Sequence, residues 1–216
     1  IAHRYDARDL SGKTVCKAAL RAAFGLSGAP EAPLFGIVGR LTEQKGIDLL
    51  PQALEGPLAA GTQLAALGSG DPHIEELVRE WASRHPARVS LRVEFDESLA
   101  HAVEAGADIF LMPSRFEPSG LNQMYSQRYG TPPVVHAVGG LVDTVIDADV
   151  RTLTDGTATG FMFQEPAAPA LADAVGRALA LYTRPDAWRA LQRSGMAQDF
   201  SWSRSAARYI DLYNSL

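Results

Sequence analysis

The feature that most constrains the fold of this chain is an alternation of short apolar runs with segments of helical period. Runs rich in Val, Ile and Leu lie at residues 34–39, 63–68, 88–93, 108–113 and 133–137. Several are apolar on both faces, as a strand must be when both faces are buried. Helical periods fill the intervals at 46–55, 72–84, 97–105 and 119–129. The alternation predicts an α/β fold, a Rossmann-like parallel sheet flanked by helices.

Beyond residue 165 the pattern changes to helices alone, at about 167–182, 185–195 and 203–215. The 216 residues suit one large domain or slightly more. A net charge of −5 disfavours a nucleic-acid surface. No apolar run approaches the ~20 residues of a membrane helix, and the single Cys16 suits a reducing compartment. We therefore expect a cytoplasmic protein without nucleic-acid or membrane partners. Because the chain opens on Ile1, we also expect it to be a piece of a longer protein.

The segments that follow the strands carry the candidate chemistry, because ligands of parallel sheets bind beyond the carboxyl ends of the strands. Arg40 and Lys45 follow the first strand, in "GRLTEQKG". The later exits read "GSGD" (68–71), "EFDES" (94–98), "SRFEPSGLNQ" (114–123) and "VGGLVDTV" (138–145). A helix opening at Ser119–Gly120 would present free backbone N–H groups to an anion. Cations, such N–H groups and close-approaching glycines together predict a ligand made of phosphates and a sugar.

Each feature also has a plain structural explanation. The Gly-x-Gly at 68–70 is typical of a tight turn, and Arg115 is expected to anchor a loop through carbonyl oxygens. Glu117 could be a first-turn carboxylate that favours the helix dipole. Asp147 and Asp149 form an Asp-x-Asp pattern, which we interpret as a solvated loop because no further ligand lies at a suitable spacing.

The sequence patterns typical of metal sites, hydrolases, P-loop proteins and dinucleotide-binding proteins do not occur in this chain. The five histidines lie apart, without the spacing of a metal site: His3, His73, His85, His101 and His136. The chain contains no nucleophile elbow, Walker loop or dinucleotide fingerprint. We therefore expect neither a metal nor a cofactor.

Taken together, "GRLTEQKGIDLL", "LGSGD", "AGADIFLMPSRFEPSGLNQMYSQRYGTPPVV" and "VGGLVDTV" closely resemble the C-terminal half of bacterial glycogen synthases and plant starch synthases. Those enzymes are retaining, metal-independent glycosyltransferases with two facing Rossmann-like domains, the GT-B fold. The resemblance runs from residues 9–26 to residues 199–213. It implies that residues 1–198 form the nucleotide-sugar-binding (donor) domain. It also implies that residues 199–216 form a helix that crosses to the other domain.

The resemblance further implies transfer of glucose from ADP-glucose to the non-reducing end of an α-1,4-glucan, with retention. Arg40 and Lys45 would hold the donor phosphates, and Glu117 would lie beside the donor glucose. These three form the implied catalytic set. The implied donor-binding residues are Gly39, Phe95, Ser119, Gly120, Leu121, Gly139 and Gly140.

The chain departs from the family pattern at three positions. Phe95 stands where a tyrosine usually packs on adenine, and a phenyl ring keeps that stacking face. The alternative for Phe95 is a core aromatic at a strand end. Ser119 replaces a frequent cysteine, and Val138 replaces a common threonine before the paired glycines.

The N-terminal half of the family, with most of the glucan contacts, is not within these residues. We therefore expect the chain alone to bind ADP weakly and to transfer no glucose. One alternative is a stand-alone nucleotide- or sugar-binding module. Another is a related synthase that uses UDP-glucose or makes a smaller product, such as a sucrose- or trehalose-type sugar.

The last helix carries an apolar stripe formed by Trp202, Tyr209, Leu212, Tyr213 and Leu216. Without the other half, this stripe could be exposed, fold back onto the body or pair with another copy. An ordinary amphipathic helix packed on its own domain is a further alternative.

Overall fold

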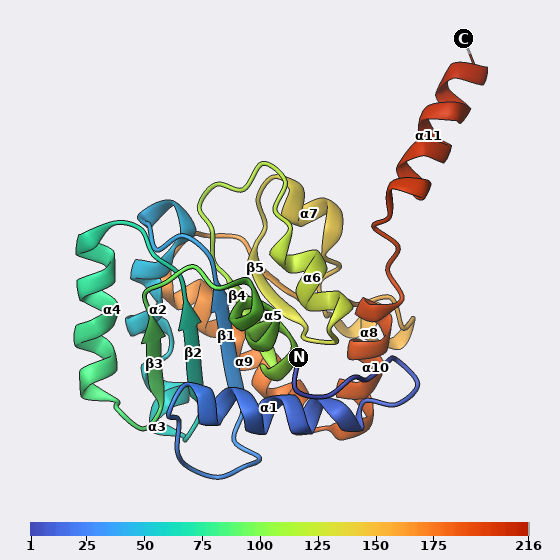
Figure 1. The fold of residues 1–216 in the computed structure, drawn as a ribbon. Helices are drawn as coiled ribbons and strands as arrows, with labels where there is room; N and C mark the ends of the chain where they lie inside the picture. Colours follow the sequence, from blue (N-terminus) through green and yellow to red (C-terminus); the bar gives the residue numbers. More distant parts are fainter. Residues whose placement is uncertain (216) are drawn as a thin grey trace.

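The computed structural model describes residues 1–215 and contains a six-stranded parallel sheet (Figure 1); Leu216 lies outside the described residues. The strands lie in the order β3-β2-β1-β4-β5-β6, and every neighbouring pair is parallel. Their bounds are β1 Leu34–Val38, β2 Gln63–Leu67, β3 Val89–Arg92, β4 Ile109–Met112, β5 Pro133–His136 and β6 Phe161–Phe163. The Rossmann-like α/β prediction is confirmed.

All five predicted strands are present, and β6 was not predicted. Its three residues are too few to show a period along the sequence. The strand exists because it pairs with β5, where Val134 lies beside Phe161 and His136 beside Phe163. Phe161 and Phe163 are buried against the core.

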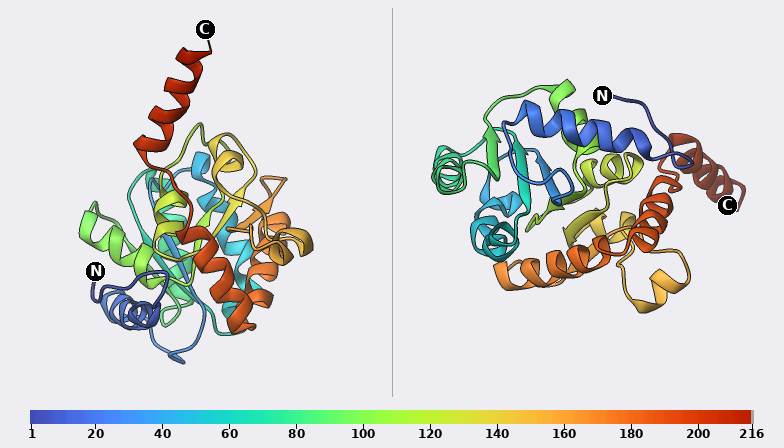
Figure 2. Two further views of the ribbon diagram at one scale, coloured as in Figure 1. Left: turned by 90° about the vertical axis from the view of Figure 1, so that its right-hand side faces the viewer. Right: turned by 90° about the horizontal axis from the view of Figure 1, so that it is seen from below.

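Helices cover both faces of the sheet, as the view from below shows (Figure 2). On one face, α1 (Ser11–Ala23) and α5 (Glu97–Gly106) bury Leu20 and Val103 in one apolar cluster. The other face carries the larger cluster, with α2 (Leu50–Ala53), α3 (Glu55–Ala59), α4 (Pro72–Arg84) and α9 (Ala168–Tyr182). The remaining helices are α6 Asn122–Arg128, α7 Gly140–Thr144, α8 Val150–Thr154, α10 Pro185–Met196 and α11 Trp202–Asn214. Within residues 1–215, no helix is long and apolar enough to cross a membrane.

The predicted helix at 46–55 was wrong in form. The segment contains the 3₁₀ turn Ile47–Leu49, then α2 and the first residue of α3, and a second 3₁₀ turn, Glu43–Lys45, lies directly before it. Gly46 separates the two turns with a φ of 68°, which a continuous helix does not allow. Pro51 lies near the start of α2, where its missing N–H costs nothing.

Helix α11 extends away from the body of the molecule in each of the ribbon views (Figures 1 and 2). Four residues of its predicted stripe are exposed: Trp202, Tyr209, Leu212 and Tyr213. The fifth, Leu216, lies outside the described residues. The alternative in which the helix packs on its own domain is therefore wrong for this structure. The division of the chain at residue 198 stays a prediction.

Candidate functional site

Arg40 and Lys45 reach one edge of the sheet through the segment that follows β1. Gly39 leaves the strand with a φ of 147°, and the 3₁₀ turn Glu43–Lys45 then carries Lys45 towards the exit of β4. Gly46 makes this approach possible, because a Cβ there would lie 2.0 Å from the carbonyl oxygen of Pro113. The two segments therefore meet by direct backbone contact.

Lys45 and Glu117, 72 residues apart in the chain, form an ion pair at this edge. The ammonium of Lys45 donates to Oε2 of Glu117, and the hydroxyl of Ser114 donates to the same oxygen at 3.2 Å. Glu117 is 7% exposed, whereas 22% of the Lys45 side chain is exposed. The carboxylate is thus fixed from two sides, while the ammonium retains donors for a further partner.

Arg40 lies at the same hollow but is less constrained. Its guanidinium is exposed and donates to Oε1 of Gln44 at 3.3 Å. The hollow has a volume of about 200 Å³. Residues that line it include Gly39, Arg40, Lys45, Ser114, Glu117, Gly120, Leu121 and Asn122. The three predicted catalytic residues therefore share one hollow with three of the predicted donor-binding residues.

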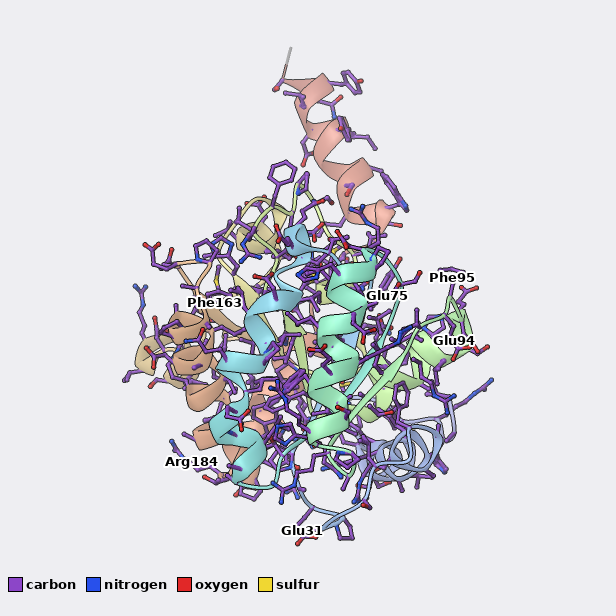
Figure 3. The ribbon with its side chains drawn as sticks, turned by 90° about the vertical axis from the view of Figure 1, so that its left-hand side faces the viewer. Glu31, Glu75, Glu94, Phe95, Phe163 and Arg184 are labelled. Carbon is purple, nitrogen blue, oxygen red and sulfur yellow. The ribbon has the colours of Figure 1, made fainter. Side chains whose placement is uncertain are left out.

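Phe95 lines a second hollow of about 190 Å³ beside the first. Gly39 and Arg40 border both hollows, so the two adjoin at these residues. Phe95 is 96% exposed, and Figure 3 shows it next to Glu94 at the outer surface. The alternative of a core aromatic at a strand end is therefore wrong.

The helix predicted to open at Ser119–Gly120 begins later, at Asn122. Gly120 has a φ of 75°, which is outside the helical region, so Ser119–Leu121 form a loop ahead of α6. The side-chain amide of Gln123 holds this loop, because its nitrogen donates to the carbonyl oxygens of Ser119 and Gly120 at 3.2 and 3.1 Å. The predicted anion site at a helix opening on Ser119–Gly120 is thus corrected to a loop.

Gly139 and Gly140 contact the Glu117 loop rather than line the first hollow. A Cβ on Gly139 would lie 2.1 Å from the carbonyl oxygen of Glu117, and one on Gly140 would lie 2.5 Å from that of Ser119. The N–H of Gly140 also donates to the Glu117 carbonyl at 3.1 Å. The close backbone approach expected at these glycines is present, and its partner is the loop that carries Glu117.

Arg115 anchors the same region, as its structural interpretation predicted. Its guanidinium pairs with both carboxylate oxygens of Asp48 at 2.6 and 2.8 Å, and it donates to the Glu43 carbonyl at 2.6 Å. The hydrogen bonds that Arg115 donates to Asp48 raise the pKa of Arg115. Arg115 therefore fixes the turn that presents Lys45.

The Asp-x-Asp segment lies away from this edge and is more ordered than the predicted solvated loop. Asp147 accepts from the Arg177 guanidinium and from the N–H of Met162 at 2.6 Å. Asp149 caps α8, and the backbone N–H of Thr152 lowers the pKa of Asp149. No group of three or more His, Cys, Asp or Glu in residues 1–215 could hold a metal ion.

Sequence reasoning missed several residues that shape the site. The hydroxyl of Ser114 contacts Glu117, the amide of Gln44 donates to the Phe116 carbonyl at 3.2 Å, and the amide of Asn122 donates to the Val38 carbonyl at 2.7 Å. All lie within or beside the motifs that were singled out. The sequence shows that these segments matter, and it does not show which side chain meets which.

The chain matches the family model described as glycosyl transferases group 1 over residues 24–193. It is 57% identical over 214 residues to a glycogen synthase of Thioalkalivibrio sulfidiphilus, a match that covers 99% of this chain and 44% of that protein. The chain therefore spans less than half the length of the curated relatives it matches.

Two solved structures are similar in fold and in sequence. One is the catalytic domain of starch synthase IV from Arabidopsis thaliana bound to ADP and acarbose, with a TM-score of 0.88 and 37% identity. The match covers 98% of this chain and 44% of that one. The other is a sucrose-phosphate synthase from Thermosynechococcus elongatus, with a TM-score of 0.66 and 29% identity, covering 92% of this chain and 48% of that one.

Proposed function

This chain belongs to the group 1 glycosyl transferases, and we propose that it is the donor-binding domain of a glycogen or starch synthase. In the complete protein it would transfer glucose from ADP-glucose to the non-reducing end of an α-1,4-glucan, with retention. The glycogen synthases and the ADP-bound starch synthase IV among its similar proteins support this assignment. The observation that carries it is the convergence of Arg40, Lys45 and Glu117 on one hollow.

We propose that Arg40 and Lys45 bind the donor diphosphate. Breaking the sugar–phosphate bond leaves negative charge on ADP, and fixed cations stabilise that charge in the transition state. Arg40 offers a planar fork of donors, and its hydrogen bond to the Gln44 side chain, at 3.3 Å, is a long one. Lys45 offers a compact charge whose remaining N–H groups can reach a phosphate oxygen while Glu117 holds the ammonium in place.

We propose that Glu117 orders the hydroxyls of the donor glucose and stabilises positive charge that develops on the sugar. Its carboxylate is held by Ser114 and Lys45, so little rearrangement is needed when the donor binds. These contacts assign it no role as a nucleophile. The adjoining hollow at Phe95 would take the adenine, against an exposed phenyl face.

The acceptor glucan would bind mainly to the part of the protein that lies beyond this chain. The matches cover 44% or less of the first curated relatives, which leaves room for a second domain that faces the hollow. A glycosyl transfer between two large substrates needs both walls of a cleft to align them and to exclude water.

Calorimetric titration of the chain with ADP and with UDP tests the site. We expect ADP to bind more tightly than UDP, and Arg40→Ala to weaken ADP binding by about 10- to 100-fold, since a charged hydrogen bond is lost. Arg151→Ala removes an exposed arginine on α8, outside both hollows, and should leave the affinity unchanged.

Equal affinity for the two nucleotides, or tighter binding of UDP, would favour the related synthase that uses UDP-glucose. Full ADP affinity in Arg40→Ala would contradict the placement of the phosphates.

A further inference from the structure

His136, the last residue of β5, faces a backbone carbonyl oxygen with each of its two ring nitrogens. Nδ1 lies 2.8 Å from the oxygen of Ser114, and Nε2 lies 2.9 Å from the oxygen of Gln164. The residue is 7% exposed, and its ring packs against Phe163 with 5.4 Å between centroids. These contacts join the exits of three neighbouring strands, β4, β5 and β6.

This geometry restricts the protonation of the ring. A carbonyl oxygen only accepts hydrogen bonds, and a neutral imidazole carries one N–H and one lone pair. In a neutral ring, one nitrogen lone pair would therefore point at a carbonyl oxygen, and that oxygen would lose the ring N–H as its donor. A ring with two N–H groups satisfies both oxygens at once.

We propose that His136 is a doubly protonated positioning residue, whose two N–H groups tie the carbonyl oxygens of Ser114 and Gln164 and so hold the loop that carries Glu117. The relevance of that loop to glycosyl transfer rests on the proposed function. The protonation of the His136 ring and the contacts of the ring do not depend on the proposed function.

The loop between Ser114 and Glu117 is then fixed at both of its ends, at one by the last residue of β5 and at the other by the first residue of α7. His136 holds its first carbonyl, and the N–H of Gly140 donates to its last carbonyl at 3.1 Å. Between these points the Ser114 hydroxyl donates to the Glu117 carboxylate. Ser114 therefore links the ring of His136, through its carbonyl oxygen, to the carboxylate of Glu117, through its hydroxyl.

The charge on the ring would be stabilised by carbonyl dipoles. Both polar contacts of the ring are to carbonyl oxygens, and within residues 1–215 no ion pair joins it to a carboxylate. The nearby carboxylate of Glu117 is already paired with Lys45. A cation at His136 would thus add positive charge next to Ser114, which lines the hollow proposed to bind a diphosphate.

NMR of the chain labelled with ¹⁵N at its histidines tests the proposal directly. At pH 7 we expect both ring nitrogens of His136 to carry protons, with two coupled N–H signals protected from exchange by burial. His73 is exposed and serves as the internal reference for a solvated ring. A ring of His136 with one protonated and one bare nitrogen would overturn the proposal.

Variants test the positioning role. His136→Phe keeps a planar ring without donors, and we expect it to shift the amide resonances of Ser114 and Glu117 and to weaken ADP binding at least about ten-fold. His136→Arg keeps a charge and several donors, and should restore part of that loss. His73→Gln should change neither readout.

Unchanged loop resonances and ADP affinity in a folded His136→Phe would overturn the positioning role. If the wild-type chain binds no ADP, the proposed function fails, and the ring protons and loop resonances still decide this proposal. If His136→Phe does not fold, the ring protons of the wild-type chain decide it.

Discussion

Lys45 and Glu117 are oppositely charged side chains that pair within the proposed donor site before any donor is present. A partly buried pair of this kind adds little to stability, because its Coulombic gain is offset by lost hydration. Its value here is orientation, since it fixes the carboxylate beside Ser114 and the ammonium towards the hollow. An arriving diphosphate would share the ammonium with Glu117 rather than meet a mobile lysine.

Glu104 on α5 shows a different effect of burial. It is 3% exposed, its Oε2 lacks a hydrogen-bond partner among the described residues, and burial raises its pKa to about 7. The folded protein therefore binds a proton more tightly at Glu104 than the unfolded chain does. The protonated carboxyl of Glu104 thus stabilises the folded state. This stabilisation is complete below about pH 4.5 and is lost as the pH rises to about 7.

We predict that Glu104→Gln removes the loss of stability that Glu104 causes as the pH rises. The free energy of unfolding of the variant relative to the wild type should increase between pH 4.5 and pH 7 by about 2 to 3 kcal/mol. Urea unfolding at a series of pH values measures it. Glu97→Gln, at an exposed position on the same helix, is the matched control and should show no such trend. A constant difference between Glu104→Gln and wild type across this range would contradict the prediction.

Among the elements, the turn from β5 into α7 decides whether the Glu117 loop keeps its place. Val138 donates to the His136 carbonyl, and Gly139 then adopts a φ of 49° directly against the Glu117 backbone. Two independent constraints therefore require glycine at position 139, its backbone conformation and the absent Cβ.

We predict that Gly139→Ala costs about 2 to 4 kcal/mol of stability, because the methyl group would meet a carbonyl oxygen and the backbone conformation is strained. ADP affinity should fall with it, since the loop must shift. Thermal unfolding and calorimetry measure the two effects.

Gly176→Ala provides the opposite case. Gly176 lies within α9, and a Cβ there would have open space. That substitution should raise stability by about 0.5 to 1 kcal/mol and leave ADP binding unchanged. A tolerated Gly139→Ala would show that the turn does not hold the loop.

At the scale of the whole molecule, the chain presents two adjoining hollows and an exposed amphipathic helix. Both hollows open at the edge of the sheet where the strands end, and α11 leaves the body exposing large apolar side chains, including Trp202 at 87% and Tyr213 at 70%. Exposed apolar stripes of this kind mark surfaces that have a partner. In the protein as proposed, that partner would be the part that lies beyond this chain.

We predict that the isolated chain binds ADP weakly and incorporates no glucose into glycogen. The donor would lack the opposite wall that aligns the acceptor and excludes water. Incorporation of labelled glucose from ADP-glucose measures this, with the full-length protein as the positive control. Robust transfer by the isolated chain would contradict the division of labour proposed here.

The sequence by itself determined the alternation of the first five strands with helices and the edge of the sheet at which the site lies. Two-sided apolar runs specify buried parallel strands, and all such strands end at one edge, so Arg40 and Glu117 had to lie along the same edge. The pairing of β1 with β4 then brings the two residues together. The same reasoning identified Arg115 as an anchor, because a guanidinium beside loops finds carbonyl oxygens and carboxylates.

Only the tertiary structure decided which atoms meet. The pairing of Lys45 with Glu117, the later start of α6 at Asn122 and the approach of Gly139 to the Glu117 loop all depend on contacts between segments far apart in the chain. Strand β6 forms by pairing with β5. His136 contacts the carbonyl oxygens of Ser114 and Gln164 because the ends of β4, β5 and β6 lie side by side. Local propensity and periodicity report on neighbours within a few residues, whereas these features depend on distances that only the packed sheet fixes.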